Sequence, residues 1–129
     1  MKSKVSGSHF VGNYRLGFKW VRLFADNSES GGSVKLIPED EGSAVVTVGL
    51  HGPWEIVFST LLHELYEAAM IDMGVRYGVS PAMSCESSDF LFVMTHNQLD
   101  EAHSRVSGML IDALPAMAKL YKKYSTWED

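Results

Sequence analysis

Residues 43–70 read SAVVTVGLHGPWEIVFSTLLHELYEAAM, and within this stretch the pattern changes from that of a strand to that of a helix. The opening segment, 43–50, is β-branched and nearly continuously apolar, which predicts a well-buried strand. A helix is expected to begin at Pro53, because proline suits the first helical turn. Apolar side chains then recur at helical spacing and would line one face of that helix: Trp54, Phe58, Leu61, Leu65 and Ala68.

Further strands are predicted on both sides of this stretch. Residues 13–24 alternate between apolar and polar side chains, which is typical of a half-buried strand. A short strand is expected at 33–37, after a turn-rich loop. Residues 89–94 are almost uniformly apolar and predict a last short strand after the helix.

A second, longer helix is predicted from about residue 97 to residue 124. Thr95 or Asn97 would cap its start, and Pro115 should bend it. Its expected core side consists of Leu99, Val106, Leu110, Ala113 and Met117. The order β-β-β-α-β-α predicts an α+β domain, in which a small mixed or antiparallel sheet of three to four strands packs against two main helices.

The composition indicates one globular domain spanning residues 1–129, with residues 1–10 expected to be flexible. The chain has 129 residues, of which 46% are hydrophobic and 21% charged, enough for a single core. No segment approaches the length of an uninterrupted membrane-spanning run, so we expect a cytoplasmic protein with no membrane partner. The net charge of -5 offers no electrostatic argument for nucleic-acid binding, and we expect no nucleic-acid partner.

The single cysteine, Cys85, restricts the kinds of metal site that the chain can build. It cannot form an intramolecular disulfide, and it excludes zinc sites that need two or more cysteines. Any metal site must therefore rely mainly on histidines and carboxylates.

The helix predicted after Pro53 carries such a group in His63, Glu64 and Glu67. Residues 63 and 67 are four apart, so both side chains lie on one helical face and can converge on one ion. No Lys or Arg occurs between residues 53 and 75 to neutralise these carboxylates, which suggests that His63 and Glu67 occupy a partly buried pocket. The plainer interpretation is a surface glutamate beside a histidine at the edge of the core.

A third ligand is expected from the segment THNQLDEAH, residues 95–103. His96 is preferred because it would end the strand at 89–94 and be held in place there. His103 is the alternative, although it fits a histidine at the core edge better. Asp100 lies between them and would either orient a ligating imidazole or act as an acid near a helix N-terminus.

The sequence STLLHELYEAA resembles the active-site helix of zincin-type metallopeptidases, particularly the compact ones of bacteria and their phages. The resemblance covers roughly residues 43–110. It implies zinc as the cofactor, His63 as the first ligand, Glu64 as the general base that activates water, and Glu67 in the second ligand position. In those enzymes the second ligand is histidine. A carboxylate there makes zinc-bound water less acidic, which argues against proteolysis more than against metal binding.

Two functions are therefore expected from the sequence. The first is a zinc-binding, metallopeptidase-like hydrolase domain, with His63, Glu67 and His96 as ligands, Glu64 as base, and a peptide or protein as substrate. The second is a non-catalytic phage or mobile-element protein that engages a host protein. Its basis is the small size, the acidic charge and the replacement of the second histidine of the zincin helix by Glu67. The segment FLFVMTHNQLDEAHSRV also resembles short phage-encoded proteins of unassigned function.

Overall fold

A computed structural model describes residues 8–28, 32–36, 43–78 and 90–125. The elements in chain order are β1 (Ser8–Leu16), β2 (Lys19–Asp26), β3 (Gly32–Leu36), β4 (Ser43–Gly49), α1 (Trp54–Asp72), β5 (Arg76–Gly78), β6 (Phe90–Phe92) and α2 (His96–Tyr124). Strands β1 to β4 form a four-stranded sheet in the order β1-β2-β4-β3, and β5 and β6 form a separate two-stranded sheet.

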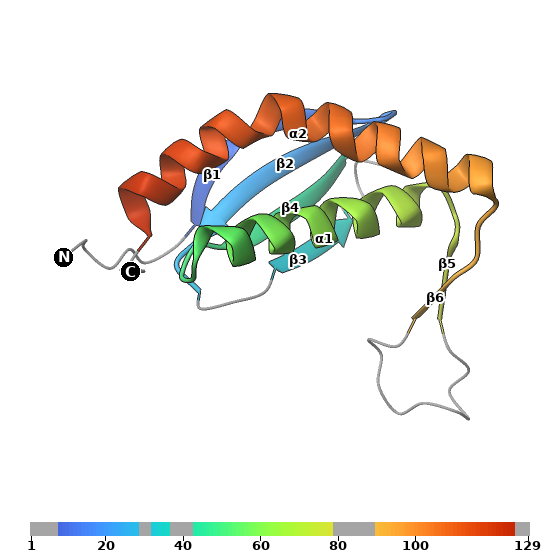
Figure 1. Ribbon diagram of the computed structural model, residues 1–129, viewed down its shortest axis with the longest axis horizontal. Helices are drawn as coiled ribbons and strands as arrows, with labels where there is room; N and C mark the ends of the chain where they lie inside the picture. Colours follow the sequence, from blue (N-terminus) through green and yellow to red (C-terminus); the bar gives the residue numbers. More distant parts are fainter. Residues whose placement is uncertain (1–7, 29–31, 37–42, 79–89, 126–129) are drawn as a thin grey trace.

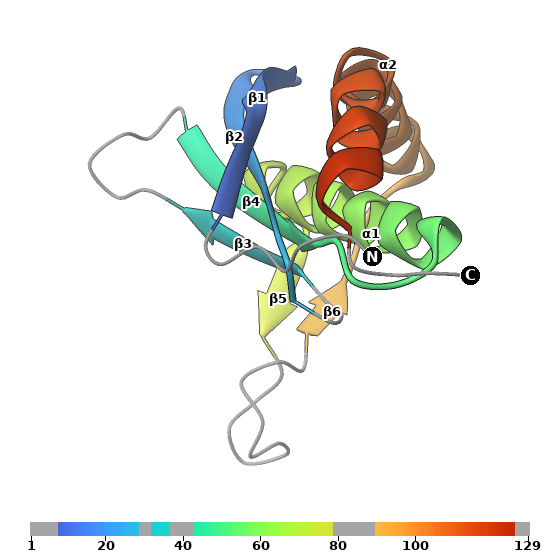
Figure 2. The ribbon, with the colours of Figure 1, turned by 90° about the vertical axis from the view of Figure 1, so that its left-hand side faces the viewer.

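The larger sheet is mixed and is covered by both helices on the same face. Strands β2 and β4 are parallel, whereas the pairs β1-β2 and β3-β4 are antiparallel. Figure 1 and Figure 2 show α1 and α2 together on one side of this sheet. The predicted α+β class, with a small sheet packed against two main helices, is confirmed.

The prediction of a single strand over residues 13–24 is wrong, because the chain reverses its direction within that segment. Leu16 pairs with Lys19 across a two-residue turn at Gly17 and Phe18. Gly17 has a φ of 66°, in the left-handed region that glycine occupies without steric cost. The reversal also changes which side chains are buried: Leu16 faces the helices, whereas Trp20 on the returning strand is exposed.

The start of β1 includes residues 8–10, which the sequence placed in a flexible segment. The ring of His9 stacks on the ring of Tyr124 near the end of α2, with the ring centroids 3.9 Å apart. This part of the N-terminal segment is therefore joined to the fold, and residues 1–7 lie outside the described residues.

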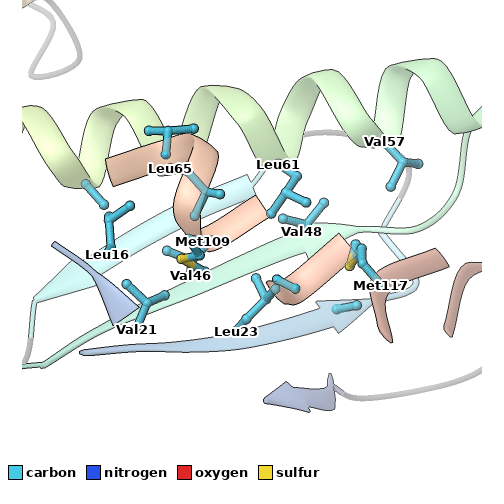
Figure 3. Close-up of a cluster of buried hydrophobic side chains, with 14 of the residues drawn as sticks. Leu16, Val21, Leu23, Val46, Val48, Val57, Leu61, Leu65, Met109 and Met117 are labelled. Atoms are coloured by element: carbon cyan, nitrogen blue, oxygen red, sulfur yellow. The ribbon is translucent and has the colours of Figure 1, made fainter. Parts of the chain in front are cut away.

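The hydrophobic core fills the space between the sheet and the helices (Figure 3). Its fully buried side chains come from every layer and include Leu23, Val46, Val48, Leu61, Leu65, Met109 and Met117. On α2, the predicted core residues Val106, Ala113 and Met117 are confirmed. Leu99 is instead 36% exposed, because the first turns of α2 run past the ends of the strands (Figure 1).

Helix α2 begins as the sequence indicates but includes one residue that was assigned to a strand. Thr95 is the N-cap and forms a capping box with Gln98. Strand β6 ends at Phe92, so His96 is the first residue of the helix rather than the end of a strand. Pro115 lies inside α2, which continues through it to Tyr124. Neither helix combines the length and apolar character that a membrane crossing requires, as far as the described residues extend.

Polar contacts hold α2 to the rest of the molecule near both of its ends. Near the start, the Arg105 Nη1 donates to Asp72 on α1 at 2.9 Å, and Lys19 on β2 lies 3.2 Å from the same carboxylate. Near the end, the Tyr121 hydroxyl donates to the carbonyl of Gly52 at 2.6 Å. The Ser125 hydroxyl donates to the carbonyl of Leu50 at 3.0 Å. These contacts fix α1 and the sheet relative to α2.

Candidate metal centre

The helix α1 brings His63, Glu64 and Glu67 together. Their ligand atoms all lie within 4.8 Å of one another. The His63 Nε2 is 3.4 Å from the Glu67 Oε2 and 4.0 Å from the Glu64 Oε1. The contact to Glu67 follows directly from the helical spacing of four residues, as predicted.

The three side chains differ strongly in exposure. The His63 side chain is 72% exposed, Glu67 is 23% exposed and Glu64 only 8%. The expectation of a partly buried pocket is thus met by Glu67 but not by His63. Glu64 lies next to the buried stripe of α1, which contains Leu61, Leu65 and Ala68, and this position turns its carboxylate toward the sheet.

Glu64 is covered by the edge strand β3. A Cβ atom added to Gly32 would lie 2.8 Å from the Cγ of Glu64 and 2.8 Å from the carbonyl oxygen of Thr47. Only a glycine therefore lets the strand approach this closely. Burial raises the pKa of the Glu64 carboxyl, the nearby Glu67 carboxylate raises it further, and His63 lowers it.

Two clefts meet at His63 on α1. The first has a volume of about 490 Å³ and is lined by Ser59, Leu62, His63, Tyr66, Glu67, Met70 and Phe92. The second has a volume of about 370 Å³ and is lined by Gly32, Ser59, Thr60, His63 and Glu64. Because Ser59 and His63 border both clefts, a ligand on the imidazole can extend to either side.

The two histidines considered as a third ligand lie elsewhere. Among the described residues, the group with metal-ligand spacing does not include His96 or His103. The His96 Nε2 is 3.5 Å from Asp100 within the first turns of α2. The His103 Nδ1 is hydrogen-bonded to the Tyr66 hydroxyl, which joins α2 to α1 beside the larger cleft. Cys85 lies outside the described residues.

Sequence reasoning missed Gly32, Tyr66 and Phe92, which complete the surroundings of the site. Gly32 and Phe92 reach the site only through tertiary structure, by the placement of β3 and β6 near α1, whereas Tyr66 lies on α1 itself, three residues after His63. The adjacent glycines at 31 and 32 were the one available signal, since glycine permits a close approach of backbone.

The pair His63 and Glu67 offers the nitrogen and oxygen donors that zinc accepts, and these are two of the three protein ligands that a catalytic zinc site usually has. Zinc accepts imidazole nitrogen and carboxylate oxygen at about 2.0–2.2 Å, so two ligands of a tetrahedral site are separated by about 3.3 Å. The His63 and Glu67 atoms are 3.4 Å apart. The Glu64 Oε1 is farther from the His63 Nε2, at 4.0 Å. This separation suits a carboxylate that contacts a water better than one that binds the metal directly. Comparison with family models, curated proteins and solved structures found no match to this chain.

Proposed function

We propose that this protein is a zinc-binding, metallopeptidase-like hydrolase domain in which His63 and Glu67 hold the metal and Glu64 is the general base. The proposal rests mainly on one observation: an imidazole and a carboxylate 3.4 Å apart, with a second carboxylate beside them, in the wall of a cleft. The resemblance of STLLHELYEAA to the helix of zincin-type enzymes agrees with the same roles.

Zinc, when bound, supplies a Lewis acid that makes water more acidic and polarises a carbonyl group. Glu64 accepts the proton that the water loses and can return it to the leaving group. A general base works best when its pKa lies near the working pH. The burial of Glu64 raises its pKa toward that range, which supports this role. Glu67 remains half-buried and keeps its oxygen directed at His63.

The two clefts support a chain-like substrate, such as a peptide, rather than a compact one. A chain bound across His63 would reach Gly32 on one side and Phe92 on the other. The first of these residues belongs to β3, an edge strand of the sheet, and an extended peptide can pair with such an edge through its main chain. The larger cleft, which contains Phe92, offers apolar contacts from Leu62, Met70 and Phe92.

The proposal does not use His96, the third ligand expected from the sequence. His96 is paired with Asp100 on α2 and is not a member of the group on α1. His103 is bonded to Tyr66 and is left out for the same reason. The variant His96→Ala therefore serves as a control that should keep its metal.

A peptide-hydrolysis assay tests the catalytic part of the proposal. The protein would be incubated with a library of internally quenched fluorogenic peptides, after chelation and again after zinc is restored. Hydrolysis should require zinc, and Glu64→Gln should lower it about 10²- to 10⁴-fold without releasing the metal. The matched control is Glu55→Gln, an exposed glutamate in the first turn of the same helix, which should retain full activity. Zinc-dependent hydrolysis that survives Glu64→Gln would refute the role of Glu64. Absence of both zinc and hydrolysis would favour a non-catalytic protein that engages a partner.

A further inference from the structure

The face of the larger sheet that points away from the helices forms a second, separate surface (Figure 2). Along β2 its side chains alternate with the core residues Val21 and Leu23, and the register of the neighbouring strands extends it sideways. We call this surface the outer sheet face. It consists of Phe10, Asn13 and Arg15 on β1, Trp20, Arg22, Phe24 and Asp26 on β2, and Val45 and Thr47 on β4.

Aromatic side chains on this face are open to solvent and in contact with their neighbours. Phe10 is 54% exposed and Trp20 is 46% exposed. The rings of Phe10 and Phe24 lie 5.4 Å apart, and the guanidinium of Arg15 lies 5.0 Å from the centre of a Trp20 ring. Large exposed aromatic groups gathered on one surface are typical of a binding site.

Charge is distributed unevenly between the two layers of the molecule. Arg15 and Arg22 are both exposed on the outer sheet face. Among the described residues, Asp26 is the one carboxylate on a strand; it lies at the end of this face and is hydrogen-bonded to Ser28. The other described carboxylates lie on the helices: Glu55, Glu64, Glu67, Asp72, Asp100, Glu101 and Asp112. The net charge of -5 therefore does not describe the local charge of this face.

We infer that the outer sheet face binds single-stranded nucleic acid. Single strands are commonly bound on the open face of a four-stranded sheet by stacking bases on aromatic side chains. Here the pairs form three successive rows, Phe10 with Phe24, Asn13 with Arg22, and Arg15 with Trp20. Alternate residues of a strand are about 6.6 Å apart, so the row that contains Arg22 lies between two rows that each carry an aromatic ring. This order suits bases stacked on the outer rows and a phosphate held by Arg22 between them.

This inference departs from the expectation of no nucleic-acid partner, which rested on the charge of the whole chain. Two arginines predict only weak and salt-sensitive binding, carried largely by stacking. The inference is independent of the metal centre, because that site lies on α1 and shares no residue with the outer sheet face.

Binding would be measured by fluorescence anisotropy with labelled short oligo(U) and oligo(dT), and with a short duplex for comparison. The full chain would be used at low salt with a chelator present, so that the metal centre does not contribute. Single strands should bind more tightly than the duplex. Trp20→Ala should weaken binding about 5-fold or more, and Trp20→Phe should largely restore it. Arg22→Gln should lower the salt dependence of log K by about 0.7.

The matched control is Ile111→Ala, since Ile111 is an exposed apolar residue on α2, away from this face. It should bind like the wild type, and a thermal melt of each variant would show that the fold is retained. Absence of saturable binding by the wild type would overturn the inference, as would equal affinities for the wild type, Trp20→Ala and Arg22→Gln. A wild-type dimer that Trp20→Ala dissociates, without binding of oligonucleotide, would also overturn it and assign the face to a second copy of the chain.

Discussion

At the scale of single residues, Glu64 combines burial with proximity to like charge. Its side chain is 8% exposed, and it lies in one cluster with Glu67 and His63. Burial and the neighbouring carboxylate both raise its pKa. The folded chain therefore holds the proton on Glu64 more tightly than the unfolded chain does. The contribution of Glu64 to stability is therefore fully present below the unfolded pKa of about 4.3. It is lost as the pH rises through the folded pKa, and it stays lost above that.

Removing this charge should stabilise the metal-free protein at neutral pH. Glu64→Gln keeps the size of the side chain but cannot ionise, so its melting temperature should exceed that of the wild type at neutral pH. The difference should shrink toward zero near pH 3, where the wild-type carboxyl is protonated in both states. Thermal melts of both proteins with a chelator present, recorded across this range, test the prediction. A difference that does not change with pH would contradict it.

Gly32 is the residue whose lack of a side chain allows β3 to cover Glu64. Gly32→Ala should lower the free energy of unfolding by about 1–3 kcal/mol, because the new Cβ meets both a side chain and the backbone oxygen of Thr47 at 2.8 Å. The control is Gly108→Ala in α2, where nothing lies within 4 Å of the added Cβ. That variant should be more stable by about 0.5–1 kcal/mol. Urea unfolding of the two variants would show opposite shifts, and equal shifts would argue against the close approach of β3.

At the scale of the elements, the sequence predicts correctly those features that depend on local patterns alone. Strand β4, helix α1 and the Thr95 cap follow from β-branched runs, helical spacing and capping chemistry. The β1-β2 hairpin was missed because both of its arms alternate, so the turn at Gly17 does not interrupt the pattern. Strand β5 is only Arg76–Gly78, too short to carry a signal of its own.

The same distinction applies to the candidate site. The pair His63 and Glu67 was predictable because the spacing of four residues within a helix fixes it. The burial of Glu64 was not, because it depends on a strand that is distant in the sequence. Likewise, nothing local indicates that the Tyr66 hydroxyl meets His103 on the other helix.

The N-terminal cap of α2 should contribute measurably to the stability of the protein. Thr95 accepts a hydrogen bond from the backbone N–H of Gln98, and the side chain of Gln98 accepts one from the backbone N–H of Thr95. Thr95→Ala should cost about 1 kcal/mol of stability, whereas Thr95→Ser should cost little because serine caps as well. Chemical denaturation of the three proteins tests this. Equal losses for alanine and serine would exclude the capping role.

At the scale of the whole molecule, α2 is joined to α1 and the sheet near both ends. In its first half, Arg105 lies 2.9 Å from Asp72 and 3.0 Å from Glu101, and its side chain is largely buried. At its far end, Tyr121 and Ser125 bond the segment that joins β4 to α1. Because α1 carries the candidate metal centre, these contacts also set where that centre lies relative to the strands.

Loss of the contacts that Arg105 makes with Asp72 and Glu101 should destabilise the whole fold. Arg105→Met keeps most of the apolar stem but removes both charge-assisted hydrogen bonds, so it should cost about 2 kcal/mol. The control is Lys119→Met, an exposed cation on the same helix, which should change stability by less than about 0.5 kcal/mol. Denaturant unfolding of both variants gives the comparison. Equal effects would mean that the pairing of Arg105 contributes nothing to the fold.

The most direct test of the proposed function is the zinc content of the protein, purified without a histidine tag or added metal, measured by elemental analysis. The wild type should contain about one zinc per chain, which His63→Ala loses and His96→Ala keeps. That result would place the metal on α1, where His63 and Glu67 are 3.4 Å apart. A wild type free of zinc, or zinc that persists in His63→Ala, would contradict the proposed centre.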